Sequence, residues 1–303
     1  MSASSSSAAG SAPATGTTAA LPTVQGRPGE KPVVKAPASA PGSELVKKVL
    51  VEGKGQQVQK GDLLVAHYLG QTWRDNTVFD NSYDRKSPAA FPIGVDKVIP
   101  GWDETLVGVP AGSRVLLSIP PDKGYGAQGN PQAGIKGDDT LVFVVDVLAS
   151  YRPDAVAEGT AKPAPKDLPQ VTGEQGKPTV TIPDGASPPR ELRAVTLVEG
   201  DGPEVEKGQL LVAQYVGLTW RDAKEFDSSW ERGQPAAFPI GVGQVIPGWD
   251  ETLVGVPAGS RVLLSIPPDK GYGPQGEPRA GIQGDDTLVF IVDVLGAHGA
   301  SRS

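Results

Sequence analysis

A stretch of 29 residues occurs twice in this chain, and this repeat constrains the possible folds more than any other feature. The sequence VIPGWDETLVGVPAGSRVLLSIPPDKGYG fills residues 98–126 and again residues 245–273, an offset of 147. The same offset aligns other matches without a gap, among them Phe79 with Phe226. Self-similarity at a fixed period indicates a duplicated structural unit. We therefore predict two similar domains.

The match also extends upstream, into a segment that precedes the strand-rich part of each copy. The pattern LPxVxG stands at residues 21–26 and again at residues 168–173. Because a passive linker has no reason to keep a copied pattern, we expect both segments to be ordered, extended and packed on the domain that follows, burying Val24 or Val171. The proline of each segment favours a sheet edge or a groove, since proline cannot donate to a central ladder. The alternative is a flexible leftover of the duplication.

The remaining segments are expected to be connections and ends. Residues 1–20 are nearly all Ser, Ala, Gly, Thr and Pro, too polar to bury enough apolar area to offset the entropy of ordering. Residues 151–167 contain three prolines, which favours a semi-extended linker and loosely coupled domains. The expected division is a disordered leader at 1–20, a first domain at 21–150 (core 43–150, extension 21–42), the linker at 151–167, a second domain at 168–297 (core 190–297, extension 168–189) and a tail at 298–303.

Composition excludes several classes of function. Cysteine is absent, which removes disulfides, thiol nucleophiles and zinc–thiolate sites. Only His67 and His298 are histidines, and the second copy has Gln214 where the first has His67, so the two copies share no catalytic histidine. The net charge is -7 without a cluster of basic residues, which argues against nucleic-acid binding. Apolar runs such as residues 288–292 are far short of the roughly 20 residues of a membrane span.

The local pattern of each copy is that of short antiparallel strands. Apolar and β-branched residues follow a mostly period-two pattern at residues 63–69, 114–119 and 141–148, between turns rich in Gly, Pro and Asp. Residues 102–106, which follow a Pro-Gly pair, have room for one short helix. One helix on a curved antiparallel sheet predicts the α+β class.

An ordered series of motifs in each copy resembles the FKBP-type peptidyl-prolyl cis-trans isomerases over roughly residues 43–150 and 190–297. In the first copy the motifs are Tyr68, the run Val78, Phe79 and Asp80, then Arg85, the run FPIG from Phe91, the run VIPGW from Val98 to Trp102, GYG around Tyr125, and the run Leu141, Val142 and Phe143. The second copy repeats the series from Tyr215 to Phe290. The resemblance implies an antiparallel half-barrel sheet wrapped around a short helix, with an apolar pocket floored by the tryptophan that starts the helix.

The resemblance also implies a role for each matched residue. The ring of the substrate proline would lie on Trp102 or Trp249, and the main-chain N–H of Ile99 or Ile246 would anchor a carbonyl. The expected walls are Tyr68, Phe79, Val98, Ile99 and Phe143, and in the second copy Tyr215, Phe226, Val245, Ile246 and Phe290. Tyr125 and Tyr272 would place a hydroxyl above the pocket. Asp80 with Arg85, and Asp227 with Arg232, would hold the wall, and Phe91 and Phe238 would support it. The alternatives are aromatic side chains that only fill the core and ion pairs that only face solvent.

Isomerisation of an X-Pro bond needs no nucleophile, which fits the scarcity of Cys and His. Rotation meets a barrier of about 18–20 kcal/mol because amide resonance is lost in the twisted state. A dry pocket favours the twisted amide, which is less dipolar than the planar one. We therefore expect an enzyme that assists protein folding without cofactor or metal. The alternative is a non-catalytic peptide-binding or chaperone scaffold that keeps only the fold.

Several positions depart from the family pattern or imitate other motifs. Ala89 and Ala236 stand where the family often has an aromatic residue, and Lys97 and Gln244 where it has an acidic one. The rim after Tyr125 also differs between copies, with Asn130, Ala133 and Ile135 in the first and Glu277, Ala280 and Ile282 in the second, which predicts different peptide selectivity. The GxGxxG match at residues 124–129 lacks a following helix. Asp138 and Asp139 are explained by a turn before a strand.

The expected partners are proline-containing polypeptides and, by the same resemblance, macrolide ligands of the rapamycin class. We expect a monomer without nucleic acid or a membrane span. Two locations stay open. The Ser/Ala-rich leader resembles the tether of exported actinobacterial lipoproteins, yet residues 1–20 show neither an apolar signal region nor a lipobox cysteine. With Met1 as the true start, the cytoplasm is expected.

Overall fold

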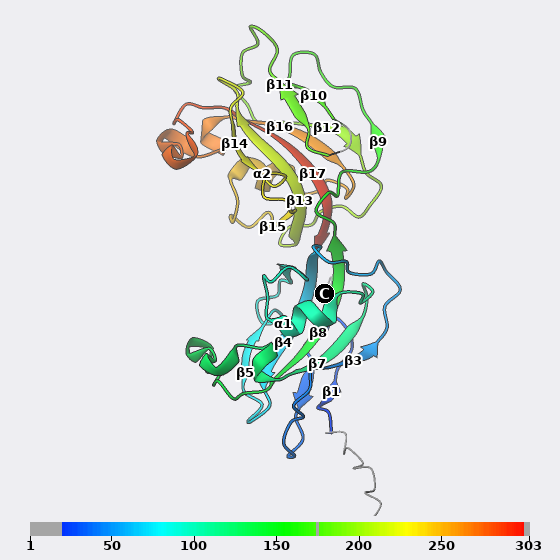
Figure 1. Cartoon of the computed structure of the whole chain (residues 1–303). Coiled ribbons are helices and arrows are strands. Elements are labelled where there is room, and N and C mark those ends of the chain that lie inside the picture. The colour runs from blue at the N-terminus through cyan, green and yellow to red at the C-terminus, as the bar shows by residue number, and fades with distance from the viewer. Residues whose placement is uncertain (1–19, 174–175, 300–303) are drawn as a thin grey trace, which may run out of the picture.

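The computed structural model describes residues 20–173 and 176–299, and its two copies of the repeat form two sheet-rich domains (Figure 1). Nearly all of the expected leader and residues 300–303 of the tail lie outside the described residues. Each domain is a mostly antiparallel sheet that holds one α-helix, as the α+β prediction requires. Within the described residues, no helix is long and apolar enough to cross a membrane.

The first domain is a six-stranded antiparallel sheet around one helix. The path of hydrogen-bonded neighbours is β3-β7-β8-β4-β5, and β6 also pairs with β4. The helix α1, Pro100–Leu106, starts two residues earlier than the sequence pattern predicts. The strands are β3 (Val46–Val51), β4 (Leu63–Thr72), β5 (Val78–Asn81), β6 (Ala89–Pro92), β7 (Arg114–Ile119) and β8 (Leu141–Tyr151).

The second domain repeats this plan and adds one strand. Its path is β14-β13-β17-β16-β12-β9, with β15 on β13 and the helix α2 at Pro247–Thr252. The added strand is β9, Thr160–Ala161, which comes from the expected linker. The others are β12 (Arg193–Glu199), β13 (Leu210–Thr219), β14 (Glu225–Ser228), β15 (Ala236–Pro239), β16 (Arg261–Ile266) and β17 (Leu288–His298).

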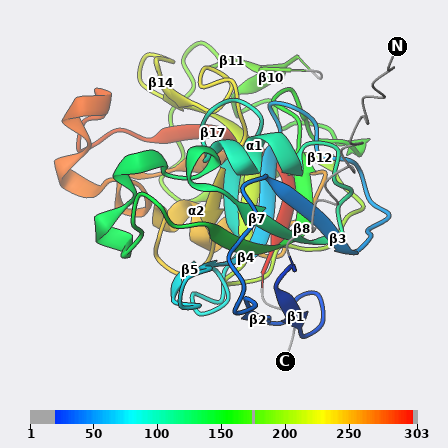
Figure 2. The same cartoon turned by 60° about the horizontal axis from the view of Figure 1, so that its bottom comes forward.

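Three 3₁₀ helices follow β7 in the first domain and β16 in the second, where the sequence predicts only turns. They are η1 (Pro121–Lys123), η2 (Gly126–Gln128) and η3 (Pro131–Ala133), and in the second domain η4 (Pro268–Lys270), η5 (Gly273–Gln275) and η6 (Pro278–Ala280). Single turns of this kind leave no helical periodicity in a sequence. The two loops that carry them, green and orange, project to the same side of the molecule in both views (Figure 1, Figure 2).

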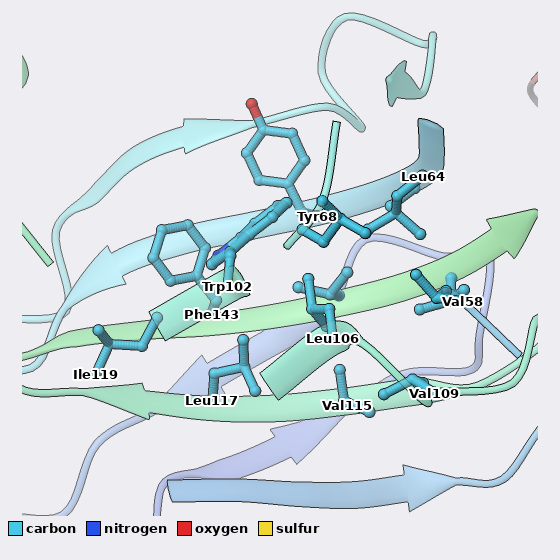
Figure 3. Packing of buried hydrophobic residues seen from close by; sticks show 14 of the residues in the cluster. Val58, Leu64, Tyr68, Trp102, Leu106, Val109, Val115, Leu117, Ile119 and Phe143 are labelled. Atoms are coloured by element: carbon cyan, nitrogen blue, oxygen red, sulfur yellow. The ribbon is translucent and has the colours of Figure 1, made fainter. Parts of the chain in front are cut away.

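The core of the first domain lies between α1 and the concave side of the sheet. Trp102 and Leu106 of the helix pack against strand residues such as Leu117 and Ile119 (Figure 3). Gly101 lets the helix approach the sheet, because a Cβ at this position would lie 2.6 Å from the Ile119 side chain. Pro100 occupies the first helical turn, where its missing N–H leaves no bond unmade. This contact places Trp102 at the open end of the core.

The duplicated LPxVxG segments form strands, which agrees with the expected extended conformation. The strand β1 (Thr23–Gln25) pairs with β2 (Val33–Lys35), and β10 (Gln170–Thr172) pairs with β11 (Thr179–Thr181). Val24 and Val171 are only half-buried. The buried residues of the duplicated segments are Pro22, Pro169 and Leu168, which is 1% exposed, and Val34 of the pairing strand β2 is 8% exposed.

A buried ion pair fastens the first of these hairpins to the sheet. Asp146 accepts hydrogen bonds from Arg114 at 2.5 and 2.7 Å and from the main-chain N–H of Gly29 at 2.8 Å. Arg114 also donates to the carbonyl oxygens of Gly26 and Glu30, at 3.0 and 2.8 Å. Removing either partner would leave a buried charge unpaired, so the hairpin is an integral part of the domain.

The expectation of loosely coupled domains is wrong, because the linker is hydrogen-bonded to the second domain and an apolar cluster joins the two domains. The Gln214 side chain donates to the Pro153 carbonyl at 2.7 Å, and the Ala157 N–H donates to Asp293 at 3.1 Å. An apolar cluster contains residues of β4 and β13 together. Prolines rule out a helix in such a linker but do not prevent it from adding to a neighbouring sheet, as β9 does.

Candidate active sites

Each domain contains a pocket whose floor is a tryptophan in the first turn of the helix. Trp102 is 4% exposed and meets three rings edge-on, with centroid distances of 5.5 Å to Tyr68, 5.2 Å to Phe91 and 5.4 Å to Phe143. Figure 3 shows Tyr68, Trp102 and Phe143 gathered at one end of the core. Edge-to-face packing is a favoured arrangement of aromatic pairs, so the indole is held rigidly.

The second domain builds the same floor from the equivalent residues. Trp249 meets Tyr215 at 5.3 Å, Phe238 at 5.5 Å and Phe290 at 5.3 Å between ring centroids. The interplanar angles are 90°, 85° and 82°. The duplication therefore preserves the geometry of the floor as well as its composition.

A glycine that the sequence analysis did not single out makes room for two of the wall rings. A Cβ at Gly70 would lie 2.6 Å from the Phe143 ring and 2.7 Å from the Phe79 ring. Gly217 has the same relation to Phe290 and Phe226, at 2.6 and 2.8 Å. The available signal is a glycine inside an apolar strand, which often marks close approach of another group.

The rim of the first pocket carries a hydrogen-bonded triad of Tyr68, Asp80 and Arg85. The Tyr68 hydroxyl donates to the Asp80 carboxylate, and Arg85 donates to Asp80 at 2.5 Å and to the Tyr68 hydroxyl oxygen at 2.8 Å. Burial, with the hydrogen bond to Asp80, raises the pKa of Tyr68 to about 12. Burial acts to raise the pKa of Asp80, but the hydrogen bonds from Tyr68 and Arg85 outweigh it and lower that pKa. At neutral pH the hydroxyl is a donor and the carboxylate is charged.

The second pocket repeats the triad with Tyr215, Asp227 and Arg232. The Tyr215 hydroxyl donates to Asp227 at 2.5 Å, and Arg232 donates to Asp227 and, at 2.6 Å, to the Tyr215 hydroxyl oxygen. Burial, with the bond to Asp227, raises the pKa of Tyr215 to about 12. Each tyrosine is thus fixed from both sides.

An aspartate in the first turn of each helix fixes the loop in front of the pocket, and sequence analysis missed it. Asp103 accepts hydrogen bonds from the main-chain N–H groups of Gly94 at 2.6 Å and Asp96 at 2.7 Å. Asp250 does the same in the second domain, at 2.6 Å to each of two glycines. An acidic residue just inside a helix is an available signal, but by itself it predicts only a favourable interaction with the helix dipole.

The fixed loop leads to the main-chain N–H of Ile99, or of Ile246 in the second domain. Both isoleucines line their pockets, immediately before the helix. Among residues 20–173 and 176–299, no group accepts a hydrogen bond from either N–H. Each pocket therefore presents a main-chain donor beside its aromatic floor.

The structure brings the predicted site residues together in two separate cavities of about 710 and 390 Å³. The first is lined by Tyr68, Phe79, Asp80, Phe91, Val98, Ile99, Trp102, Tyr125 and Phe143. The second is lined by Tyr215, Phe226, Asp227, Phe238, Val245, Ile246, Trp249, Tyr272 and Phe290. Arg85 and Arg232 act on the wall through the two triads.

The rims of the two cavities differ in charge. The first cavity is also lined by Asp96, Lys97 and Asn130, whereas the second has Gly243 and Gln244 at the positions equivalent to the first two. Tyr125 and Tyr272 stand at the rims, 39% and 41% exposed. Burial and the charge of the nearby aspartate raise the pKa of each, and for Tyr272 the charge of Glu277 adds to the effect. The charge of Glu277 therefore has no counterpart at the first rim, where the equivalent residue is Asn130.

His67 and Asp139, for which the sequence predicts no catalytic or metal-binding role, have structural partners. His67 lies in β4, where its Nδ1 is 2.9 Å from the Ser82 hydroxyl and its ring stacks on Tyr83. Asp139 is buried and accepts hydrogen bonds from Arg74 at 2.5 and 2.7 Å. Both side chains stabilise the scaffold away from the pockets.

Comparison with known proteins agrees with this geometry. A family model described as FKBP-type peptidyl-prolyl cis-trans isomerase matches residues 54–148 and 202–295. Peptidyl-prolyl cis-trans isomerase FKBP9 of Rattus norvegicus is 32% identical over 246 residues, which cover 81% of this chain and 36% of that protein. The FK506-binding protein of Streptomyces anulatus is 41% identical over 119 residues, or 39% of this chain and 95% of that protein.

Among solved structures, FkpA from Escherichia coli is 42% identical, with a TM-score of 0.32, over 35% of this chain and 47% of that one. The chain spans only about a third of the length of the FKBP9 relative. The two regions that match the family model make up more than half of the chain, and each contains one complete pocket. The chain therefore belongs to the FKBP-type peptidyl-prolyl cis-trans isomerase family, with one family domain in each copy of the repeat.

Proposed function

We propose that each domain accelerates rotation about X-Pro bonds in polypeptides, without a covalent step and without a cofactor. The observation that carries this proposal is the pairing, in both copies, of a rigid tryptophan floor with an unused main-chain N–H at its edge. The functional units are residues 21–150 and 168–297.

The pocket acts by binding the twisted amide more tightly than the planar one. The proline ring lies on Trp102 and the wall rings exclude water, so the substrate amide leaves a polar solvent for an apolar site. The twisted amide has the smaller dipole and loses less solvation in this transfer. A millionfold acceleration requires about 8 kcal/mol of such preference for the transition state.

The polar groups of the site orient the substrate. The Ile99 N–H donates to a substrate carbonyl, and the Tyr125 hydroxyl donates from above the pocket. Asp80 and Arg85 keep Tyr68 in place through the triad, and because the pKa of Tyr68 is raised to about 12 its hydroxyl stays protonated at neutral pH. The second domain uses Ile246, Tyr272 and the equivalent triad in the same way.

The partners that suit this site are proline-containing segments of unfolded or folding proteins. Macrolides of the rapamycin class, which present a ring and a carbonyl to such a pocket, are candidate inhibitors. The rims predict different preferences among peptides, because Lys97 belongs to the first pocket and Glu277 lies near the second.

The test is the refolding of a protein whose slow phase is limited by proline isomerisation, with the full chain as catalyst. We expect the chain to accelerate this phase, and Trp102→Ala combined with Trp249→Ala to abolish the acceleration. Arg27→Ala with Arg190→Ala removes two large exposed side chains that line neither pocket and serves as the matched control. An unchanged refolding rate with the wild-type chain would reject the enzyme and leave the scaffold.

A further inference from the structure

The two domains meet through the same face of the repeat unit. The apolar cluster at the contact takes Leu63 and Val65 from β4 and Leu210 and Val212 from β13. These residues are related by the offset of the repeat, Leu63 to Leu210 and Val65 to Val212. A contact made by one patch on both sides is isologous, which is the geometry of a twofold dimer.

The residues around this cluster repeat the pairing. Ala90 has its equivalent in Ala237, and Leu148 has its equivalent in Leu295, and all four pack against the cluster. Figure 1 shows the ends of β8 (green) and β17 (red) running in opposite directions where the domains meet. The contact therefore relates the two domains as the halves of an internal dimer.

This face is distinct from the core of either domain. Along β4, Leu64 and Ala66 belong to the first domain's core, whereas Leu63 and Val65 belong to the contact. Successive residues of a strand point to opposite sides of the sheet. The continuous apolar run from residue 63 is thus explained by burial of both sides of the strand. One side lies in the core of the first domain, and the other lies against the second domain.

The contact is not fully symmetric, and one close approach shows why. The Tyr151 hydroxyl is 2.7 Å from Nε2 of His298, its equivalent in the second copy. The same hydroxyl would lie 2.0 Å from a Cβ at Gly296. The first copy has Ala149 at the position equivalent to Gly296. Tyrosine on one face therefore requires glycine on the other.

We propose that this face is a self-complementary docking surface of the repeat unit, through which the two domains hold each other as an internal dimer, and that the Tyr151–Gly296 contact selects the pairing of the first domain with the second. The face of the first domain, with Ala149 and Tyr151, is the first type, and the face of the second domain, with Gly296 and His298, is the second type. Two faces of the first type would place a tyrosine hydroxyl against an alanine Cβ twice. Two faces of the second type would place histidine against glycine, without a clash. The partner of each face is another copy of the unit.

The docking is tested on the full chain by small-angle X-ray scattering, which reports the radius of gyration. Val65→Asp with Val212→Asp places two charges in the contact without touching either core, and we expect the radius of gyration to rise. Val33→Asp with Val49→Asp makes the same chemical change at positions that are 67% and 45% exposed, and we expect no change. An equal radius of gyration for wild type and the contact variant would overturn the proposal.

The selection of the pairing is tested by two exchanges that make the faces identical. Gly296→Ala with His298→Tyr gives two faces of the first type, and we expect the chain to open. Ala149→Gly with Tyr151→His gives two faces of the second type, and we expect it to stay closed at neutral pH. Circular dichroism checks that both variants keep their sheets. Equal behaviour of the two variants would reject the selective role of the Tyr151–Gly296 contact.

Discussion

The Tyr151 hydroxyl lies 2.7 Å from Nε2 of His298, so a histidine of the second domain is paired across the contact with the first. Burial lowers the pKa of His298 from 6.5 to about 4. Burial also raises the pKa of Tyr151 to about 12, so this partner stays neutral over the whole acidic range. The contact thus holds His298 in its neutral form.

The first prediction is that the contact weakens in mild acid. In the closed state the two domains are in contact, and in the open state they have separated. The pKa of His298 is lower in the closed state, so the open state binds the proton more readily. The full stability of the closed state is therefore present only above about pH 6.5. It should be lost as the pH falls from there toward about 4. The radius of gyration should therefore rise earlier with falling pH in the wild type than in His298→Gln. Superimposable pH profiles would show that His298 has no part in this response.

The second prediction is that the two pockets work independently. Trp102→Ala should remove the activity of the first pocket and leave that of the second, and Trp249→Ala should do the converse, because the two cavities share no lining residue. The isomerisation rates of the two single variants with a proline peptide should then add up to the rate of the wild-type chain. Complete loss of activity from either single substitution would indicate one shared site.

The third prediction concerns the hydroxyl at the rim. In a Trp249→Ala background, Tyr125→Phe should lower kcat/KM by about 2- to 13-fold, because one hydrogen bond of about 0.5–1.5 kcal/mol is lost. This loss should be smaller than that caused by Trp102→Ala in the same background. A larger effect for Tyr125→Phe than for Trp102→Ala would contradict the assignment of the indole as the floor.

The fourth prediction follows from the close approach at Gly70. Gly70→Ala should displace the Phe79 and Phe143 rings, since its Cβ would lie 2.7 and 2.6 Å from them. Overpacking of this kind costs about 1–3 kcal/mol, so urea unfolding should occur at a lower midpoint and the first pocket should lose activity. Gly217→Ala should affect only the second pocket. Unchanged activity and stability in Gly70→Ala would show that the rings can move freely.

The fifth prediction concerns selectivity at the rims. Each pocket is measured alone by inactivating the other through its tryptophan, with peptides that carry Lys or Glu before proline. The ratio of kcat/KM for the Lys peptide to that for the Glu peptide should be up to about 5-fold higher in the second pocket than in the first. The limit is set by exposed charge pairs, which contribute at most about 1 kcal/mol. Asn130→Glu and Glu277→Asn should exchange the preferences. The same ratio for both pockets would remove Glu277 as a determinant.

The sheet and the pocket could be predicted because each depends on residues whose pattern is local or repeated. Period-two runs predict β7 within its observed bounds, and the start of β4 and β8. The pattern predicts a short helix at residues 102–106, and the family resemblance is what places Trp102 at the floor of the pocket. The 147-residue offset then transfers each assignment to the second copy.

The features that were missed depend on contacts between distant parts of the chain. The roles of Gly70 and Asp103 appear only when the rings and the loop are in place. The strand β9 forms because β12 offers a free edge to the linker, which no property of residues 160–161 alone reveals. The apolar run from residue 63 predicts a strand, but it does not predict which part of the chain covers the second side of that strand.

The most direct test of the proposed activity is exchange spectroscopy by nuclear magnetic resonance on a proline peptide, which measures cis–trans exchange at equilibrium. The full chain in catalytic amounts should bring this exchange from the uncatalysed range of tens to hundreds of seconds into the range of seconds or faster. The chain carrying Trp102→Ala and Trp249→Ala should not. Peptide signals that shift with the wild-type chain while the exchange rate stays at the uncatalysed value would show binding without catalysis and contradict the account.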